Sequence, residues 1–484
     1  MLRRWARQFR RALRFFPLLP IFVDTQPDTP STRTLARRLA ALAVPVVLTQ
    51  VGMMGFGVVD IVMLGRVGVE ALDASALGGL WLFGTAIFGI GVMFGLDPII
   101  AHAHGRGDGG RSGLALQRGL VVATLISVPL MGVGWLTEEV LLLMRQDPTL
   151  AADAETYVLI QIWSVGPLLW FYGLRQYLQS RELVAPALWV TLIANVINVL
   201  GNELLIFDHG HGFGGMGLRG AGLASGVTRT FLIVGLGLWV WRKQLHRGAW
   251  QPWSRAAFEP RGLLEILRYG APTGVHYTIE VWAFQCSTLL AGGLGRDELA
   301  AHSIVLNMAS VTFMVPLGIS FAASTMVGNL LGAGRRASAQ RVAWLAVAMG
   351  AGVMVASALV LVSTRNFLPR VYTSDVTVLA MAATILPIAA SFQVFDGIQV
   401  VASGVLRGMG DTISAALFNA VAYFVIALPL SAWLVYSGFG LRAIWAALVL
   451  GLALVAVPLL AWIYWRGPAT RGSPEDRRTP TQDG

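Results

Sequence analysis

Long apolar runs, each followed by a short polar segment, recur along nearly the whole chain. Each is long enough to cross a bilayer, which takes about 20 residues of helix. The runs of the first half cover residues 35–62, 71–101, 114–136, 157–178, 186–207 and 217–241. Those of the second half cover residues 264–290, 299–327, 342–362, 376–402, 413–436 and 441–464. The pattern predicts an all-α polytopic membrane protein with about 12 transmembrane helices.

The second six runs repeat the first six. Pro45 and Pro272 occupy the same place in the first run of each half, 227 positions apart. At the same spacing, Gly105 in one loop falls on Gly332 in another. Such tandem repeats are typical of transporters, whose functional site lies between the repeats near the middle of the membrane. The acidic residue Glu280 has no acidic counterpart in the first half.

Polar segments divide the chain into five parts. We expect a basic cytoplasmic segment at 1–34, an N-terminal six-helix bundle at 35–241, a cytoplasmic connection at 242–263, a C-terminal six-helix bundle at 264–465 and a cytoplasmic tail at 466–484. The first 20 residues gather aromatic side chains on one helical face and arginines mostly elsewhere. This segment is therefore either an amphipathic helix at the membrane surface or a basic tail without fixed structure.

Composition supports a membrane protein. Of the 484 residues 55% are hydrophobic and only 13% are charged, whereas a soluble domain has about 25% charged residues. The single cysteine, Cys286, lies in an apolar run, so neither a disulfide nor a thiolate metal cluster can be formed within one chain.

The net charge of +10 reports topology rather than a nucleic-acid partner. Seven of the 36 Lys and Arg residues fall in one alternate set of loops, and Arg229 falls inside a run. The others are assigned to the two tails and the remaining loops. Because basic residues accumulate on the cytoplasmic side, we expect both termini in the cytoplasm and a multi-pass protein of the cytoplasmic (inner) membrane.

Acidic residues inside the apolar runs are the first candidates for function. Charged groups are costly at bilayer depth, so they usually face a polar cavity or a partner. Glu280 and Asp396 lie farthest from the ends of their runs, and Asp60 lies nearer the end of its run. Two carboxylates in one bundle can hold a cation or share a proton. The alternatives are a paired carboxyl that joins two helices and, for Asp60, an anchor at the membrane surface.

Polar neighbours accompany these acids. His276 is four residues before Glu280, on the same helical face, and either relays a proton or hydrogen-bonds the acid. Asn195 and Asn198, with Asn202, form one amide stripe in an apolar helix. Asp60 is a plausible partner for these amides; the alternative is an ordinary contact between helices.

Motifs of soluble enzymes do not fit this chain. Residues 105–110 satisfy GxGxxG formally but follow a membrane run rather than a strand, so they are predicted to be a turn. Neither HExxH nor GxSxG occurs. A membrane-embedded enzyme is therefore disfavoured, and no cofactor is expected.

Several motifs together resemble the multidrug and toxic compound extrusion family, the MATE transporters. They are the pattern from Pro45 through VVDIVMLG at 58–65, the turn HGRGD at 104–108, the GAG at 332–334 and the sequence VLRGMGD at 405–411. Acids at both Glu280 and Asp396 are similar to the NorM-type branch. Some relatives carry a Tyr one turn before the second acid, where this chain has Phe392. This departure weakens the case for sodium coordination, and the choice between sodium and a proton stays open.

The resemblance implies two homologous six-helix bundles around a central cleft that opens alternately to each side. It further implies export of cationic or amphipathic organic compounds in exchange for sodium ions or protons, by a monomer surrounded by membrane lipid. Cation coupling is then expected at Glu280, Asp396 and Asp60. Sodium is the only metal ion to consider, and its site would be Glu280 and Asp396. Cleft-lining residues are expected at Asn195, Asn198, His276, Tyr277 and Gln393. A lipid-linked oligosaccharide flippase of the same superfamily is the alternative.

Overall fold

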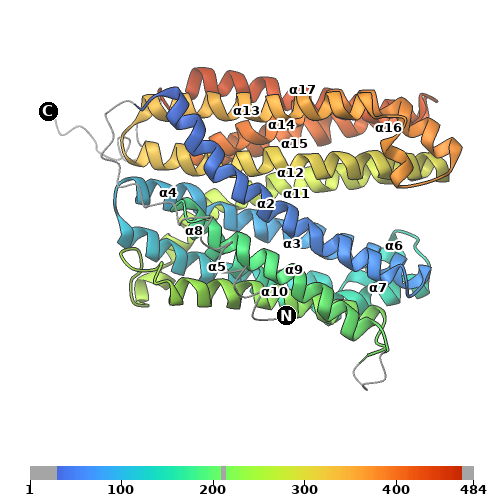
Figure 1. Cartoon of the computed structure of the whole chain (residues 1–484), viewed down its shortest axis with the longest axis horizontal. Helices are drawn as coiled ribbons and strands as arrows, with labels where there is room; N and C mark the ends of the chain where they lie inside the picture. The colour runs from blue at the N-terminus through green and yellow to red at the C-terminus, as the bar shows by residue number, and fades with distance from the viewer. Residues whose placement is uncertain (1–29, 209–213, 471–484) are drawn as a thin grey trace, which may run out of the picture.

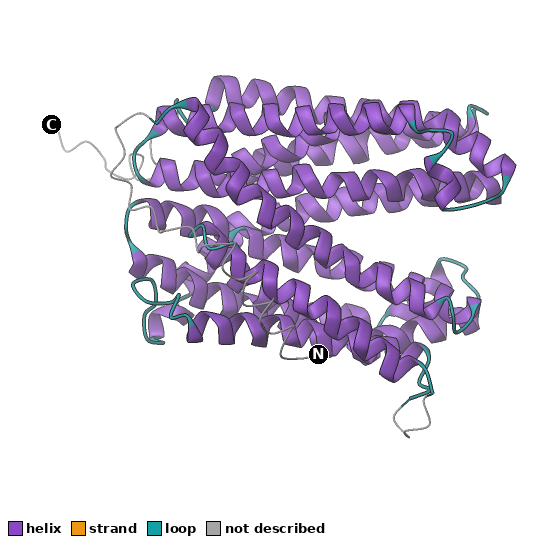
Figure 2. Ribbon diagram, in the orientation of Figure 1, coloured by secondary structure: helices purple, strands orange, loops and turns teal. Residues whose placement is uncertain are grey.

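The described part of the chain consists of helices joined by short loops and turns. The computed structural model describes residues 30–208 and 214–470, and within them no strand occurs (Figure 2). Most of the basic N-terminal segment and most of the tail lie outside the described residues, so the two interpretations of the first 20 residues both stay open.

The first half contains nine α-helices and one 3-10 turn. They are α2 (Thr32–Leu64), α3 (Val69–Phe94), α4 (Leu96–Gly105), α5 (Gly109–Gly134), α6 (Thr137–Leu143), α7 (Pro148–Gln161), η1 (Ile162–Ser164), α8 (Val165–Ser180), α9 (Ala185–Ile206) and α10 (Leu218–Arg242).

The connection and the second half follow in the same manner. They contain η2 (Arg255–Phe258), α11 (Pro260–Leu294), α12 (Arg296–Gly332), α13 (Arg336–Ser363), η3 (Leu368–Val371), α14 (Val376–Gly408), α15 (Thr412–Ala420), the π-helix η4 (Val421–Ala427), α16 (Leu428–Tyr436) and α17 (Gly440–Arg466).

These helices confirm the predicted membrane protein. Among the described residues, 11 helical spans are long and apolar enough to cross a bilayer. The run predicted at 264–290 corresponds to α11, which has 35 residues and carries polar side chains such as His276 and Glu280; it completes the set of twelve. The helices α2 and α11 continue through Pro45 and Pro272 without interruption.

The glycine-rich turns confirm the repeat locally. Gly107 and Gly334 follow helices at equivalent places, with φ angles of 78° and 75°, a left-handed conformation that favours glycine. Asp108 then caps α5 by accepting a hydrogen bond from the backbone N–H of Arg111. The GxGxxG sequence is thus a helix-connecting turn, as predicted.

The two halves lie one above the other in Figure 1, and the first helix of each half crosses toward the other. Thus α2 packs on α12 of the second half, with Val47 against Gly318, and farther along it packs on α9. Its repeat mate α11 packs on α3 of the first half, where Gly274 meets Gly91. Small residues at these crossings let the backbones approach closely.

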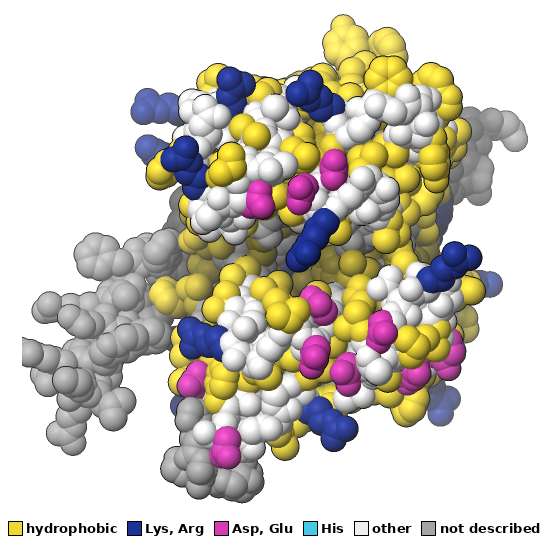
Figure 3. Space-filling view, turned by 90° about the vertical axis from the view of Figure 1, so that its right-hand side faces the viewer, with side chains coloured by type: hydrophobic (Ala, Val, Ile, Leu, Met, Phe, Trp, Pro, Cys, Tyr) yellow, Lys and Arg dark blue, Asp and Glu magenta, His cyan; other side chains and the backbone are white. Residues whose placement is uncertain are grey.

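Contacts between the halves gather at one end, which we call the basic end because its loops carry most of the basic residues. It is the left-hand end in Figure 1. There the Asn329 amide of α12 donates to Glu182 at 3.0 Å, and the His102 ring nitrogen lies 3.0 Å from the Gly408 carbonyl. The opposite end is hollowed between the two halves (Figure 3). The halves therefore enclose a cleft that opens at that end.

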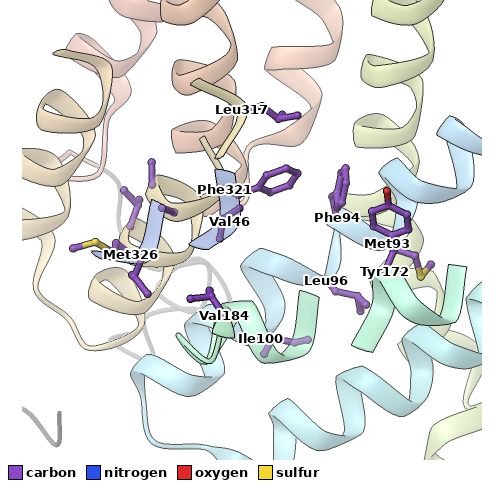
Figure 4. Close-up of a cluster of buried hydrophobic side chains, with 14 of the residues drawn as sticks. Val46, Met93, Phe94, Leu96, Ile100, Tyr172, Val184, Leu317, Phe321 and Met326 are labelled. Carbon is purple, nitrogen blue, oxygen red and sulfur yellow. The ribbon is translucent and has the colours of Figure 1, made fainter. Parts of the chain in front are cut away.

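An apolar core joins the halves between these two ends. Phe94 of α3 and Phe321 of α12 have ring centroids 4.7 Å apart, and both side chains are buried. Figure 4 shows them with Tyr172, Leu317 and Val46, and these five residues come from the four helices α2, α3, α8 and α12. This core separates the hollow from the basic end.

Candidate functional site

In the first half, polar side chains from α9 and α10 surround Asp60 of α2. The amides of Asn202 and Asn198 donate to one carboxylate oxygen at 2.6 and 3.4 Å, and the Ser225 hydroxyl donates to the other at 2.6 Å. Asp60 is 8% exposed. The interpretation of Asp60 as the partner of the amide stripe fits this geometry, whereas a surface anchor would leave the carboxylate in contact with lipid headgroups.

Asn195 does not belong to this network. Its amide donates to the backbone carbonyls of Gly52 and Thr191, both at 2.9 Å. The helices α2 and α9 run side by side in the same direction, so Asn195 lies level with Gly52 and Asn202 lies level with Asp60. The stripe therefore follows the seam between the two helices, and only its far end reaches the acid.

A partly buried arginine completes the surroundings of Asp60. Arg229 of α10 is one turn beyond Ser225, interacts electrostatically with Asp60 and donates to the Ser164 hydroxyl at 3.2 Å. An anionic Asp60 is thus compensated within the first half, partly by charge and partly by three hydrogen-bond donors.

In the second half, Glu280 of α11 is buried beside His276. The Nε2 atom of His276 lies 3.8 Å from a Glu280 oxygen, which is longer than a hydrogen bond. The same nitrogen lies 3.3 Å from the amide nitrogen of Gln399, which also donates to Asn419 at 3.1 Å. The remaining Glu280 oxygen, Oε1, has no hydrogen-bond partner among the described residues.

Asp396 of α14 lies close enough to Glu280 for the two carboxyl groups to interact electrostatically. It is 4% exposed, and its Oδ1 atom is likewise without a partner in the described part of the chain. One turn earlier, Gln393 donates to the Thr312 hydroxyl at 2.6 Å. Two adjacent carboxyl groups with free oxygens can share a proton or coordinate a cation.

Tyr423 is a member of this site that the sequence analysis missed. It lies in the π-helix η4, interacts electrostatically with both Glu280 and Asp396, and its hydroxyl has no partner within the described ranges. Phe392, at the position where some relatives have Tyr, instead packs against Phe284 and Trp445. A phenol hydroxyl is therefore present near the acids, but from another helix.

Tyr277 lies at the interface between the halves and also interacts electrostatically with Glu280. Its ring is 5.2 Å from that of Phe94, and its hydroxyl accepts a hydrogen bond from Arg407 at 3.1 Å. Arg407 and, from the first half, Arg175 are two further residues of this interface. The charge count had named only Arg229 inside a run. That was wrong, because Arg175 lies inside the run at 157–178 and α14 continues past its own run to Gly408.

The ligands available limit the choice of ion. The described residues contain no group of three or more His, Cys, Asp and Glu side chains that could hold a metal ion. Two carboxyl groups with neutral oxygens nearby suit a proton or a weakly bound hard cation such as sodium rather than a zinc or copper centre. The chain thus carries two separate carboxylate networks, one in each half.

Comparisons with known proteins agree with this arrangement. The family model described as MatE matches residues 45–204 and 272–433, once in each half. The chain is 36% identical over 443 residues to the probable multidrug resistance protein NorM of Mesorhizobium japonicum, covering 88% of this chain and 93% of that one. It is 32% identical to multidrug and toxin extrusion protein 2 of Mus musculus, covering 90% and 75%.

A solved structure shares the fold. The crystal structure of the eukaryotic MATE transporter AtDTX14 superimposes with a TM-score of 0.84, at 23% identity, over 90% of this chain and 97% of that one.

Proposed function

This chain belongs to the MATE family of transporters, on the NorM-type side, and from that premise we propose that it drives multidrug export by antiport of a cation bound at Glu280 and Asp396. Export of small organic compounds follows from its relatives, which are transporters and not enzymes. The coupling ion, its site and the sequence of states belong to the proposal.

The observation that carries the proposal is the pair of buried carboxyl groups in the second half. Each has one oxygen without a partner among the described residues, and the Tyr423 hydroxyl beside them is equally without one. Buried polar atoms in proteins nearly always have partners. A bound sodium ion or shared protons supply them, and in either case binding depends on both acids.

Alternating access supplies the link between ion and drug. The halves meet at the basic end and part at the opposite end (Figure 3). By the charge distribution the basic end faces the cytoplasm, so both termini are cytoplasmic and the hollow opens outward. The protein works as a monomer in the inner membrane. Coupling requires only that cation and drug bind the inward-open and outward-open states with different affinities.

Within this scheme Asp60 serves the first half. With Asn198, Asn202 and Ser225 it forms a polar network that a proton or a cationic drug changes by neutralising the carboxylate. Gln393 and His276 support the acids of the second half, and Asn195 stabilises the seam of α2 and α9.

The test is uphill efflux of ethidium from proteoliposomes with either a sodium or a proton gradient imposed. We expect one gradient to drive efflux in the unaltered protein, and both Glu280→Gln and Asp396→Asn to abolish it. Asp153→Asn is the matched control, because Asp153 is an exposed carboxylate of α7. Undiminished gradient-driven efflux in Glu280→Gln refutes the assignment of the site.

A further inference from the structure

Two buried arginines lie between the halves, outside both carboxylate networks. Arg175 of α8 and Arg407 of α14 are each only 3% exposed. Arg407 donates through Nη1 to the Tyr277 hydroxyl at 3.1 Å. Buried arginines normally have their N–H groups paired, because an unpaired charge in a low-dielectric interior is costly.

Aromatic rings enclose both guanidinium groups. The ring of Phe321 is shared: its centroid lies 5.6 Å from the Arg175 guanidinium carbon and 4.8 Å from that of Arg407. Tyr172 adds a second ring to Arg175 at 5.6 Å, and Phe94 adds one to Arg407 at 5.9 Å. Figure 4 shows Phe94, Tyr172 and Phe321 close together in this core. Stacking on a ring leaves the N–H groups in the guanidinium plane free to donate.

Donors outnumber acceptors in this cluster. Nη1 and Nη2 of Arg175, and Nε and Nη2 of Arg407, have no hydrogen-bond partner among the described residues. The carboxylate beside Arg407, that of Asp97, accepts from Ser180 at 2.6 Å and from Thr325 at 3.4 Å through Oδ1. Its Oδ2 atom lies 3.9 Å from Arg407 Nε.

The charges do not balance either. Within the described ranges, Asp97 is the only carboxylate within 4.0 Å of either guanidinium group. Arg407 therefore has one carboxylate at ion-pair distance, whereas the positive charge of Arg175 has none within the described ranges. Of these residues Arg175 and Asp97 belong to the first half, whereas Arg407, Phe321 and Tyr277 belong to the second, so any movement of the halves at the basic end opens the cluster.

We propose that Arg175 and Arg407 form a binding site for one monovalent anionic group, with the aromatic rings as its walls. The planar fork of arginine matches a carboxylate, and the rings suit the flat body of an amphipathic drug. The group is the carboxylate of an amphoteric cargo molecule or a small inorganic anion. While the halves are in contact at the basic end, the Asp97 carboxylate occupies the position beside Arg407. It moves away from Arg407 when the halves separate. The inference rests on the proposed export function but not on the coupling ion.

Anion binding is measured first, on the purified full chain in lipid nanodiscs. The reference anion is gluconate, whose bulky polyhydroxy chain does not fit between aromatic walls. It is replaced by chloride or by benzoate at constant sodium and constant ionic strength. The midpoint of thermal unfolding is recorded, because a ligand that binds the folded state raises it. We expect benzoate or chloride to raise the midpoint, and Arg175→Gln and Arg407→Gln each to weaken binding by about tenfold. Asp97→Asn should instead strengthen binding, since it removes the competing carboxylate.

The matched control is Arg118→Gln. Arg118 pairs with Glu259 at 3.1 Å on the basic side of the fold, so this variant loses an arginine ion pair without touching the cluster. The opposite signs expected for Asp97→Asn and for the two arginine variants distinguish anion binding from a general loss of folding.

Transport assays then distinguish the two possible ligands, the carboxylate of the cargo molecule and a small inorganic anion. Initial rates are measured for norfloxacin, which carries a carboxylate, for its methyl ester, which does not, and for ethidium. If the cargo carboxylate is the ligand, Arg407→Gln lowers kcat/KM for norfloxacin about tenfold and leaves the ester and ethidium within about twofold. If an inorganic anion is the ligand, ethidium export depends on chloride in the unaltered protein and loses that dependence in Arg407→Gln.

The proposal is overturned if neither anion raises the unfolding midpoint and all three compounds respond equally to Arg407→Gln. Failure of the cation coupling gives a different result: ethidium export then lacks dependence on either gradient, while the anion effects on unfolding persist.

Discussion

Gly91 of α3 offers a sharp test of how the two halves meet. A Cβ atom at this position would lie 2.6 Å from the Cα of Gly274 in α11, and 3.0 Å from both the Gly274 nitrogen and the Thr273 carbonyl oxygen. All three atoms are backbone, so no side chain can rotate out of the way. Since ordinary contact begins at 3.4 Å, Gly91→Ala forces the two helices apart by about 0.8 Å in this state.

The cost of such overpacking is about 1–3 kcal/mol, and it applies only while the seam between α3 and α11 is closed. If the seam opens with the basic end, the substitution favours the other state by roughly 5- to 150-fold. The folded protein should persist in both states, because the change is confined to one contact between the halves.

The assay is a distance measurement across the basic end. The single natural cysteine allows a Cys286→Ser background, in which spin labels at Lys243→Cys and Ala337→Cys report the separation of the halves from two exposed sites. We expect Gly91→Ala to increase the long-distance population. Gly79→Ala is the control on the same helix, since a Cβ there meets nothing within 4 Å. An unchanged distance distribution in Gly91→Ala would refute the claim that this contact closes the basic end.

Three further predictions concern single side chains. Asn202→Ala removes the 2.6 Å donor to Asp60, a bond to a charged group worth about 1.5–3 kcal/mol; it should lower the unfolding midpoint at neutral pH, and an unchanged midpoint would contradict the network. Tyr423→Phe removes a hydroxyl with no partner in the described residues, so it should weaken cation-dependent export while leaving the midpoint nearly unchanged; the reverse pattern would exclude Tyr423 from the site. The Thr149 hydroxyl and two backbone N–H groups lower the pKa of Asp147, the N-cap of α7. Its stabilising effect on α7 is therefore present above the ordinary carboxyl pKa and lost as pH falls through the lowered pKa. Hydrogen exchange in the first turn of α7 measures this pH dependence. The Asp147→Ala variant is expected to show none of it.

The sequence predicted the helices well because bilayer length and apolarity are properties of continuous segments. It also predicted the partnership of Asp60 with the amides of α9, since the spacing of Asn198 and Asn202 puts them on one face. It did not predict the separate position of Asn195. Which residue of α9 meets which residue of α2 depends on the direction and offset of two packed helices, which a single-helix pattern does not contain.

Other site residues had no local signal. Tyr423 is one aromatic residue among many in an apolar run, and it reaches the acids from a π-helix, whose wider turn shifts the faces that follow away from α-helical periodicity. Arg175 and Arg407 were counted with the loops because basic residues near the ends of apolar runs usually lie at the membrane surface. Arg175 instead lies inside its run, α14 extends past its run to include Arg407, and both arginines are buried where the halves meet.

The claim that Glu280 and Asp396 bind the coupling cation is tested most directly by measuring what drug binding releases. Ethidium is added to the purified protein in nanodiscs, and the release of protons into weakly buffered solution, or of preloaded radioactive sodium, is recorded. The account predicts release of one of these ions by the unaltered protein and none by the Glu280→Gln, Asp396→Asn double variant. Undiminished release by the double variant would contradict it.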